Sequence, residues 1–435
     1  MSQPVPAEAD VLVVGGGVIG LSIAWRAAQQ GLAVVVADPQ PGQGATHAAA
    51  GMLTPIAEAA YAEREIFALG QDSLRRYPAF VAELERATGL PTGFRQTGTL
   101  QIAYDSDDLA LLAELRVLQE SFGVHLRQLT PRECREAEPT LDPAVRGGLL
   151  APDDGSVDPR LLSVALLAAA EGAGVRLVRQ PVVEIDCRDG RARGARLADG
   201  TVVGAAWTVL AAGWESGTLP GLPAGIAPPV RPVKGQIIRL RTGPAGHPVT
   251  AAALAAPAQP PALLNRTIRG TVRGSTVYLV PRDTGELVVG ATQEELGPDT
   301  TVTAGAVWEL LRDARTLVPG ITELELVDVV ARLRPGTPDN APIIGPASVP
   351  GLVLATGHFR AGVLLAPVTA DTVSAYLRTG TPDKIWTAFE PGRFPARQRS
   401  RPDAVREDPD PAAQAAATQD STPSVARPDE VAAWR

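Results

Sequence analysis

Residues 11–20 read Val11-Leu-Val-Val-Gly-Gly-Gly-Val-Ile-Gly20, and this stretch decides the fold of the chain. The apolar residues predict a buried parallel strand, and the glycines that follow have the spacing G-x-G-x-x-G. Apolar residues at helical spacing come next and end at Gly31. Ala33-Val-Val-Val-Ala37 then predicts a second strand, which ends at Asp38. Strand, glycines, helix, strand and acid in this order predict a dinucleotide-binding unit.

Each glycine of the motif has its own physical purpose. Gly15 permits a tight turn, Gly17 lets the backbone approach a pyrophosphate, and Gly20 lets the helix pack closely on the strand. The free N–H groups at the start of the helix would face the phosphates. Asp38 would accept hydrogen bonds from ribose hydroxyls. The motif by itself does not distinguish NAD from FAD.

The composition is that of a soluble protein with room for two domains. The chain has 435 residues, of which 45% are hydrophobic and 20% are charged. A net charge of -8 argues against nucleic-acid and anionic-membrane partners. Its two cysteines, Cys134 and Cys187, form neither a disulfide framework nor a thiolate metal site, so we expect no metal and a reducing, cytoplasmic setting. Residues 1–10 lack a basic segment and the apolar run from Val11 is soon broken by glycine, so we expect no signal peptide and no membrane span.

Periodicity and turn signals predict the remaining elements. Helices are expected at residues 63–88, 105–122, 158–174, 303–317 and 363–377. Strands are expected at residues 98–104, 175–178, 207–213, 233–240, 277–281, 286–290, 323–334 and 350–357. Residues 244–262 are rich in Ala and Pro and predict a surface loop. Residues 395–435 have almost no large apolar residues and predict a disordered tail.

These elements predict an α/β chain, α+β overall, in which a Rossmann-like dinucleotide-binding domain is discontinuous in sequence. Apolar strands that end in small residues recur before Gly213 and Gly357, so the first domain resumes twice. Three such strand–glycine segments favour the larger FAD over NAD. We assign residues 8–90, 146–225 and 335–385 to the FAD-binding domain, and residues 91–145 and 226–334 to an antiparallel-sheet, substrate-binding domain.

Four parts of the sequence carry a resemblance to a known family. They are the glycine motif, Ala48-Ala-Ala-Gly-Met52, Val277-Tyr-Leu-Val-Pro-Arg282 with Leu287-Val-Val-Gly-Ala-Thr292, and Arg332-Leu-Arg-Pro-Gly-Thr337 with Gly357-His-Phe-Arg-Ala-Gly-Val-Leu-Leu-Ala-Pro367. The chain resembles the FAD-dependent amine oxidases of the D-amino-acid oxidase type over roughly residues 8–385. The second and fourth parts are narrower in occurrence and resemble the glycine oxidase branch of thiamine biosynthesis.

The resemblance implies a set of site residues. Arg334 and Arg360 would bind the substrate on its carboxylate side, and Tyr278 would close the pocket. The FAD would lie along Gly15, Gly17, Val18, Ile19, Gly20, Asp38, Pro39, Ala45, Thr46, Ala50, Gly51, Met52, Val182, Gly213, His358, Phe359, Arg360, Ala361, Gly362, Val363 and Leu364. The C-terminal flavin loop has no cysteine, unlike the covalent-flavin sarcosine oxidases, so the resemblance implies non-covalent FAD.

The resemblance also implies an activity. Glycine and related small amines, including sarcosine and D-amino acids, would pass a hydride from the α-carbon to flavin N5. Molecular oxygen would then be reduced to hydrogen peroxide, and the imine would give glyoxylate and ammonia or supply dehydroglycine for thiamine thiazole synthesis. Family members are commonly homotetramers, which implies a homo-oligomer. His47 and Gln293 depart from the family pattern and affect the expected substrate preference. Asp38 stands where the family usually has the longer Glu, so its reach to the ribose is shorter.

The residues themselves support part of this chemistry. A carboxylate needs a planar, permanently charged partner, and arginine supplies a bidentate one. Arg334 follows a predicted strand and precedes Pro335-Gly336, which restricts its backbone. Tyr278 on a strand suits either a hydrogen-bonding lid or simple core packing. A helix starting near Val363 would stabilise negative charge on the reduced flavin with its N-terminal dipole.

Other functions fit parts of the sequence. A D-amino-acid or sarcosine oxidase, or a dehydrogenase that feeds a quinone, would keep the same fold, and a substrate panel with and without oxygen separates these. A flavin-binding protein without turnover would act through residues 395–435, and deletion of this segment tests that role. An NAD-dependent dehydrogenase is disfavoured by the three strand–glycine segments.

Overall fold

The computed structural model describes residues 8–59, 63–242, 262–272 and 274–394. The predicted disordered tail at residues 395–435 and almost all of the predicted loop at residues 244–262 lie outside the described residues. Most of residues 1–10, on which the signal-peptide expectation rests, also lie outside them.

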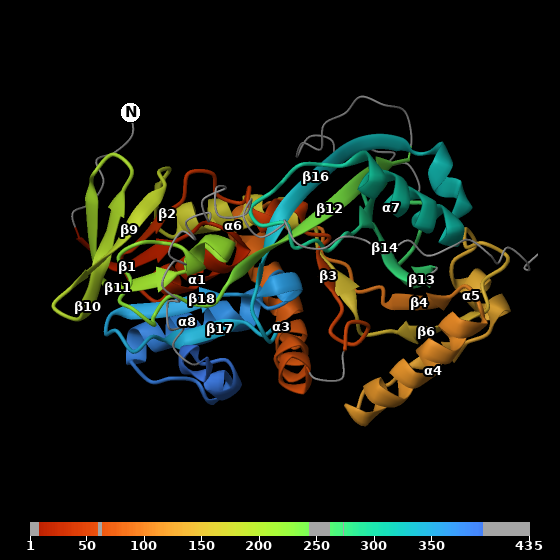
Figure 1. The fold of residues 1–435 in the computed structure, drawn as a ribbon, viewed down its shortest axis with the longest axis horizontal. Coiled ribbons are helices and arrows are strands. Elements are labelled where there is room, and N and C mark those ends of the chain that lie inside the picture. Colours follow the sequence, from red (N-terminus) through yellow and green to blue (C-terminus); the bar gives the residue numbers. More distant parts are fainter. Residues whose placement is uncertain (1–7, 60–62, 243–261, 273, 395–435) are drawn as a thin grey trace, which may run out of the picture. The chain divides into compact units, whose positions relative to one another are not determined.

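The first sheet is built around β1 (Glu8–Val14), which pairs in parallel with β2 (Val34–Ala37) and β11 (Val202–Leu210). Its path runs β17-β18-β11-β1-β2-β8, and a hairpin of β9 and β10 joins at β11 (Figure 1). The further strands are β8 (Arg176–Val178), β9 (Val182–Arg188), β10 (Arg191–Leu197), β17 (Ile343–Pro346) and β18 (Leu352–Thr356). Because β2, β1, β11 and β18 are parallel, their carboxyl ends meet at one edge of the sheet, where α/β folds bind ligands.

The second sheet has the order β16-β12-β15-β14-β13-β4-β6-β5 and is mostly antiparallel. Its bounds are β4 (Thr99–Ala103), β5 (Arg127–Leu129), β6 (Gly147–Ala151), β12 (Arg231–Arg241), β13 (Thr267–Val272), β14 (Ser275–Pro281), β15 (Glu286–Gly290) and β16 (Glu325–Gly336). The long strands β12 and β16 run side by side along it (Figure 1). A small sheet pairs β3 (Met52–Leu53) with β7 (Gly155–Ser156). The division into two domains stays a prediction. Its boundary after residue 145 falls just before β6, so the prediction places β6 in the FAD-binding domain, whereas β6 pairs with β4 and β5 of the second sheet.

Helices pack on both sheets. Their bounds are α1 (Val18–Gln29), α2 (Ala45–Ala48), α3 (Arg64–Thr88), α4 (Ser106–Ser121), α5 (Pro131–Ala137), α6 (Pro159–Gly172), α7 (Ala304–Leu317) and α8 (Ala366–Thr379). Helix α1 contacts α6 and α8, and α3 contacts the same two helices. Trp25, Tyr77 and Phe80 are buried in this layer. Helix α7 packs on β12 and β14 of the second sheet (Figure 1).

The helix predicted to start at Val363 begins three residues later, at Ala366. A short 3-10 turn, η4 (Phe359–Ala361), occupies the loop instead. Pro367 explains the start, because proline fits the first turn of a helix, where its missing N–H has no partner to lose. The N-terminal dipole therefore starts at Ala366 and not at Val363, and its effect on the flavin stays a prediction.

Candidate active site

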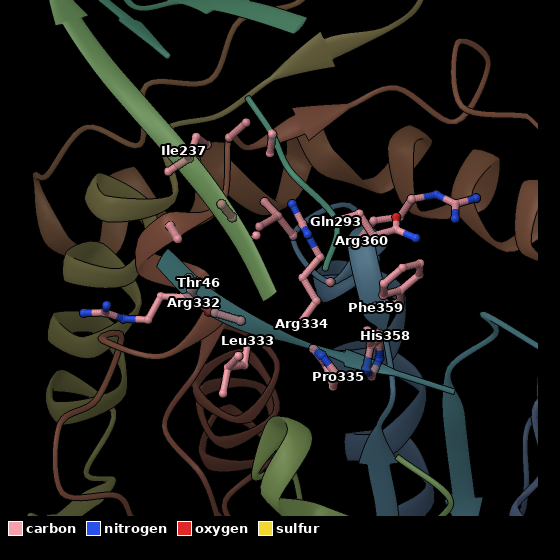
Figure 2. Close-up of a pocket in the computed structure, with 18 of the residues that line it drawn as sticks. Thr46, Ile237, Gln293, Arg332, Leu333, Arg334, Pro335, His358, Phe359 and Arg360 are labelled. Carbon is pink, nitrogen blue, oxygen red and sulfur yellow. The ribbon is translucent and has the colours of Figure 1, made fainter. Parts of the chain in front are cut away.

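A cavity of about 1640 Å³ runs along the carboxyl edge of the first sheet and reaches the second sheet. Its wall includes most of the residues that the sequence nominated (Figure 2). These are Gly15, Gly17, Val18, Ile19, Asp38, Pro39, Ala45, Thr46, Ala50, Gly51, Met52, Val182, Gly213, Tyr278, Arg334, His358, Phe359, Arg360, Gly362 and Val363. Gly20, Ala361 and Leu364 do not line it. The structure thus brings together residues that are spread over the whole described chain.

The glycine motif forms one end of this cavity. Gly15 has a φ of +105°, and a Cβ there would clash with the carbonyl oxygen of Ala211. A Cβ on Gly20 would clash with the carbonyl oxygen of Gly15, so glycine is required for α1 to lie this close to β1. Gly17 faces the cavity, where the nearest atom to an added Cβ is Thr46 Oγ1 at 3.5 Å. The backbone at this point is open to a close-lying ligand.

Three backbone amides at this end of the cavity already have protein partners. The N–H of Val18 donates to Thr46 Oγ1 at 3.1 Å, so this amide is not free for a phosphate as the motif alone suggested. The N–H of Gly16 donates to Asp38 Oδ2 at 2.7 Å, and that of Gln40 donates to Oδ1 at 2.7 Å. Each carboxylate oxygen can accept a second hydrogen bond, so Asp38 remains able to accept one from a ribose hydroxyl.

The small-residue segment that follows is held from behind by a buried arginine. Arg282, only 2% exposed, donates to the carbonyl oxygens of Ala50 and of Val157, the latter at 2.9 Å. It also lies 3.6 Å from Asp158, which caps the start of α6. Burial lowers the pKa of Arg282, while the carboxylate of Asp158 opposes this change. Arg282 therefore joins Ala50 to the start of α6.

Arg334 extends from β16 on the cavity wall (Figure 2). Its Nη1 donates to the carbonyl oxygen of Thr292 at 3.0 Å, and no ion pair links it to a carboxylate among the described residues. Space for the guanidinium depends on Gly235, because a Cβ there would clash with it. The Arg334 side chain is thus oriented by backbone carbonyls, and its charge is left for a ligand.

Tyr278, on β14, lies close enough to Arg334, on β16, for the two side chains to interact. Its ring packs over Gly290, where an added Cβ would lie 2.5 Å from the hydroxyl oxygen. Burial raises the pKa of the Tyr278 hydroxyl, and the nearby positive charge of Arg334 opposes that rise. The phenol therefore stays protonated and can donate a hydrogen bond inside the cavity.

Arg360 differs from Arg334, because carboxylates surround it. It forms an ion pair with Glu63, and its Nε lies 4.0 Å from Glu58. Glu58 in turn pairs with Arg269 of β13 at 2.8 Å. The role of Arg360 in binding a substrate carboxylate stays a prediction, and it would require Arg360 to share its charge with these glutamates.

His358 and His47 have different environments. Burial lowers the pKa of His358, which lines the cavity, to about 3, and its Nε2 lies 3.1 Å from Thr369 Oγ1. His358 is therefore neutral at pH 7. His47 does not line the cavity. Burial and the charges of Arg160, Arg332 and Arg239 lower its pKa to about 4.

Sequence reasoning missed several charged residues of the cavity, among them Glu58 and Arg269. Glu58 and Arg269 are 211 residues apart and belong to no motif, so only their meeting across the cavity reveals them. Gln293, which departs from the family pattern, does line the cavity (Figure 2).

Within the described ranges, no group of three His, Cys, Asp or Glu side chains is placed to hold a metal ion. The helices of that same part of the chain are too short or too polar to cross a membrane.

Comparison with known proteins agrees with this geometry. The model of the family described as "FAD dependent oxidoreductase" matches residues 10–376. This chain belongs to that family. The FAD-dependent oxidoreductase is 32% identical to a glycine oxidase from Geobacillus kaustophilus over 363 residues, which cover 83% of the chain and 90% of that relative. The crystal structure of glycine oxidase from Geobacillus kaustophilus superimposes with a TM-score of 0.78 at 30% identity and covers 89% of the chain and all of that structure.

A longer relative is also similar to this FAD-dependent oxidoreductase. The bifunctional protein ThiO/ThiG from Synechocystis is 34% identical over 388 residues, which cover 88% of the chain. The match covers 54% of that relative, so the oxidoreductase spans about half the length of the bifunctional relatives.

The residues of the cavity fit FAD. An extended dinucleotide needs a glycine cradle at its phosphates, and Gly15 and Gly17 supply one with the backbone exposed. It also needs a long cavity, and this one continues from the glycines to Arg334 and Tyr278. Cys134 and Cys187 do not line it. FAD and the side chain of Arg334 can therefore share one continuous space.

Proposed function

We propose that this chain is an oxidase of glycine and related small amines, with sarcosine and D-amino acids as further substrates. The observation that carries the proposal is Arg334, an arginine without a carboxylate partner among the described residues, on the wall of the cavity that begins at the glycine motif. Such a guanidinium matches the one group that these substrates share, the α-carboxylate. The likeness to glycine oxidases supports the choice of substrate.

The side chains bind and orient the substrate. When bound, FAD accepts the hydride that leaves the substrate α-carbon. Arg334 binds the carboxylate through its planar fork, and Tyr278 forms the adjacent wall and offers its hydroxyl as a donor. The substrate amine must be neutral, and transfer from water into this cavity disfavours its charged form. Neutral His358 adds no positive charge that would oppose loss of the hydride.

The proposed products follow from the balance of the reaction. The α-carbon loses a hydride and the nitrogen a proton, which leaves an imine. Water converts the imine of glycine to glyoxylate and ammonia, and oxygen takes up the two electrons as hydrogen peroxide. The ThiO/ThiG relatives support a further proposal, that the imine serves the synthesis of the thiamine thiazole. We also propose that FAD is bound non-covalently, that the enzyme is cytoplasmic and that it forms a homotetramer. Light scattering tests the oligomeric state.

The first test is a spectrum of the purified protein. Glycine added without oxygen should bleach the flavin absorbance, and air should restore it with one hydrogen peroxide per substrate. Bleaching by sarcosine or D-alanine but not by glycine would show that the substrate is one of these amines and not glycine. Reoxidation by a quinone but not by oxygen would replace the oxidase with a dehydrogenase. A flavin that none of these amines reduces would contradict the proposal.

A further inference from the structure

Four charged side chains form a continuous ion-pair cluster beside the proposed substrate site. Glu58 follows β3, Arg269 lies on β13, Arg360 lies in η4 and Glu63 precedes α3. Glu58 pairs with Arg269 at 2.8 Å and lies 4.0 Å from Arg360, which also pairs with Glu63. Glu58, Arg269 and Arg360 line the cavity, whereas Glu63 does not. We refer to these four residues as the Glu58 cluster.

The Glu58 cluster contains as many carboxylates as guanidiniums, so its formal charges cancel. Its side chains are only partly exposed, from 12% for Glu63 to 32% for Arg360, and their charges are therefore weakly screened. Arg334 stands outside the cluster without a carboxylate of its own among the described residues. Of these five side chains, Arg334 thus leaves one positive charge for one carboxylate.

Tyr278 connects Arg334 to the Glu58 cluster. Across the β13–β14 pair, Tyr278 lies directly opposite Arg269. The charges of Arg334, Glu58 and Arg269 all act on the Tyr278 hydroxyl. A substrate whose carboxylate binds Arg334 lies beside this ring, and a substituent that extends along the ring approaches the carboxylate of Glu58.

We propose that Glu58 restricts this enzyme to amino acids with a single carboxylate, by repelling a second carboxylate and by pairing with Arg269, which would otherwise bind it. The inference rests on the proposed function and adds a substrate class to it. A second carboxylate on the substrate meets the negative charge of Glu58 and finds Arg269 and Arg360 already paired. A neutral substituent of the same size meets neither penalty. Exclusion by like charge is a common source of specificity.

Three substrates separate charge from size. Sarcosine is the small reference, iminodiacetate carries a second carboxylate on the amine substituent, and its monoamide is neutral at that position and nearly isosteric. Rates of flavin reduction by each, measured without oxygen on the holoenzyme, give a selectivity ratio of monoamide over diacid. The wild-type protein should favour the monoamide by about tenfold or more, since one unfavourable charge contact of about 1.4 kcal/mol changes a rate or affinity tenfold.

Glu58→Gln should abolish this preference. The amide removes the repulsion and frees Arg269, while Arg360 stays paired with Glu63. The rate with iminodiacetate should therefore rise about tenfold, while that with sarcosine changes less than about threefold. Glu309→Gln is the matched control, because Glu309 lines the same cavity on α7 but is not among the ion pairs of the cluster. It should leave both rates unchanged.

Distinct results would overturn the proposal. Equal wild-type rates with diacid and monoamide would do so without any variant, and this arm does not depend on the folding of Glu58→Gln. An equal gain from Glu309→Gln would assign selectivity to the net charge of the cavity instead of Glu58. If sarcosine and glycine also failed to reduce the flavin, the proposed function would fail with it, whereas normal sarcosine rates without charge selectivity would overturn the role of Glu58 alone.

Discussion

Arg334 and Arg360 show that the partners of an arginine, and not its residue type, decide whether its charge is available to a ligand. Both are arginines that the family resemblance nominates for the substrate carboxylate. Arg334 donates to the carbonyl oxygen of Thr292 and has no carboxylate partner among the described residues, while Arg360 is paired with Glu63 and lies close to Glu58. The two arginines therefore predict different consequences on substitution.

Replacing Arg334 tests its assignment. Arg334→Met should lower kcat/KM for glycine by at least about 100-fold, because charge-assisted hydrogen bonds of about 1.5–3 kcal/mol each are lost. Arg334→Lys should recover only part of this loss, since lysine lacks the planar fork. Steady-state peroxide assays measure both. Arg378→Met, an exposed arginine of α8, is the control and should behave as wild type. An Arg334→Met enzyme with unchanged KM and kcat would contradict the assignment.

His358 makes a prediction about acid stability. Burial lowers its folded pKa to about 3, whereas the unfolded chain binds this proton near pH 6.5. As pH falls from 6.5 towards 3, the unfolded state binds more protons, and stability decreases by up to about 1.4 kcal/mol per pH unit. His358→Gln should flatten the pH dependence of the free energy of unfolding in this window, measured by urea titration. An exposed-histidine variant, His125→Gln, should leave the slope unchanged, and an equally steep slope in His358→Gln would contradict the prediction.

At the scale of elements, local signals were read well where capping residues mark a boundary. Asp105 caps α4 and Asp158 caps α6, at the residues where the two predicted helices begin. Helix α5 was missed although Thr130 and Glu133 form a capping box, because the helix is only 7 residues long. Strands β3, β5, β6, β7, β13 and β17 were also missed. They are short, and tertiary pairing defines them more than periodicity does.

Arg282 links two elements that surround the dinucleotide end of the cavity, so its removal should affect FAD binding. Arg282→Met leaves the carbonyl oxygens of Ala50 and Val157 without this donor and Asp158 without its charge partner. The FAD dissociation constant should rise about tenfold or more, since an unsatisfied buried acceptor costs about 1–3 kcal/mol. Flavin fluorescence quenching measures this on apoprotein. Arg132→Met, at an exposed site on α5, provides the control, and an unchanged affinity with intact circular dichroism would reject the role of Arg282.

At the scale of the whole molecule, one cavity is lined by the carboxyl edge of the first sheet and by strands of the second. A ligand in this cavity contacts both sheets at once. Its binding energy therefore contributes to the stability of both, because a ligand that binds only the folded state shifts the unfolding equilibrium.

Removal of FAD should accordingly lower the Tm of the whole described unit. Adding FAD back to the apoprotein should restore it in a concentration-dependent way, with a stabilisation of about 2.7 kcal/mol when free FAD reaches 100 times its Kd. Differential scanning fluorimetry provides the measurement, and NAD at equal concentration is the control ligand. A similar rise in Tm with NAD would argue against the selectivity for FAD that the long cavity predicts.

The sequence by itself determined the dinucleotide-binding unit, because glycine spacing, strand and helix are neighbours along the chain and their contacts follow from local geometry. It also nominated Arg334 and Tyr278 through short motifs. Only the tertiary structure decided that Glu58 meets Arg269 and Arg360, and that Arg282 holds Ala50. These partners are far apart in sequence, and their meeting depends on the order and register of strands, which local patterns do not encode.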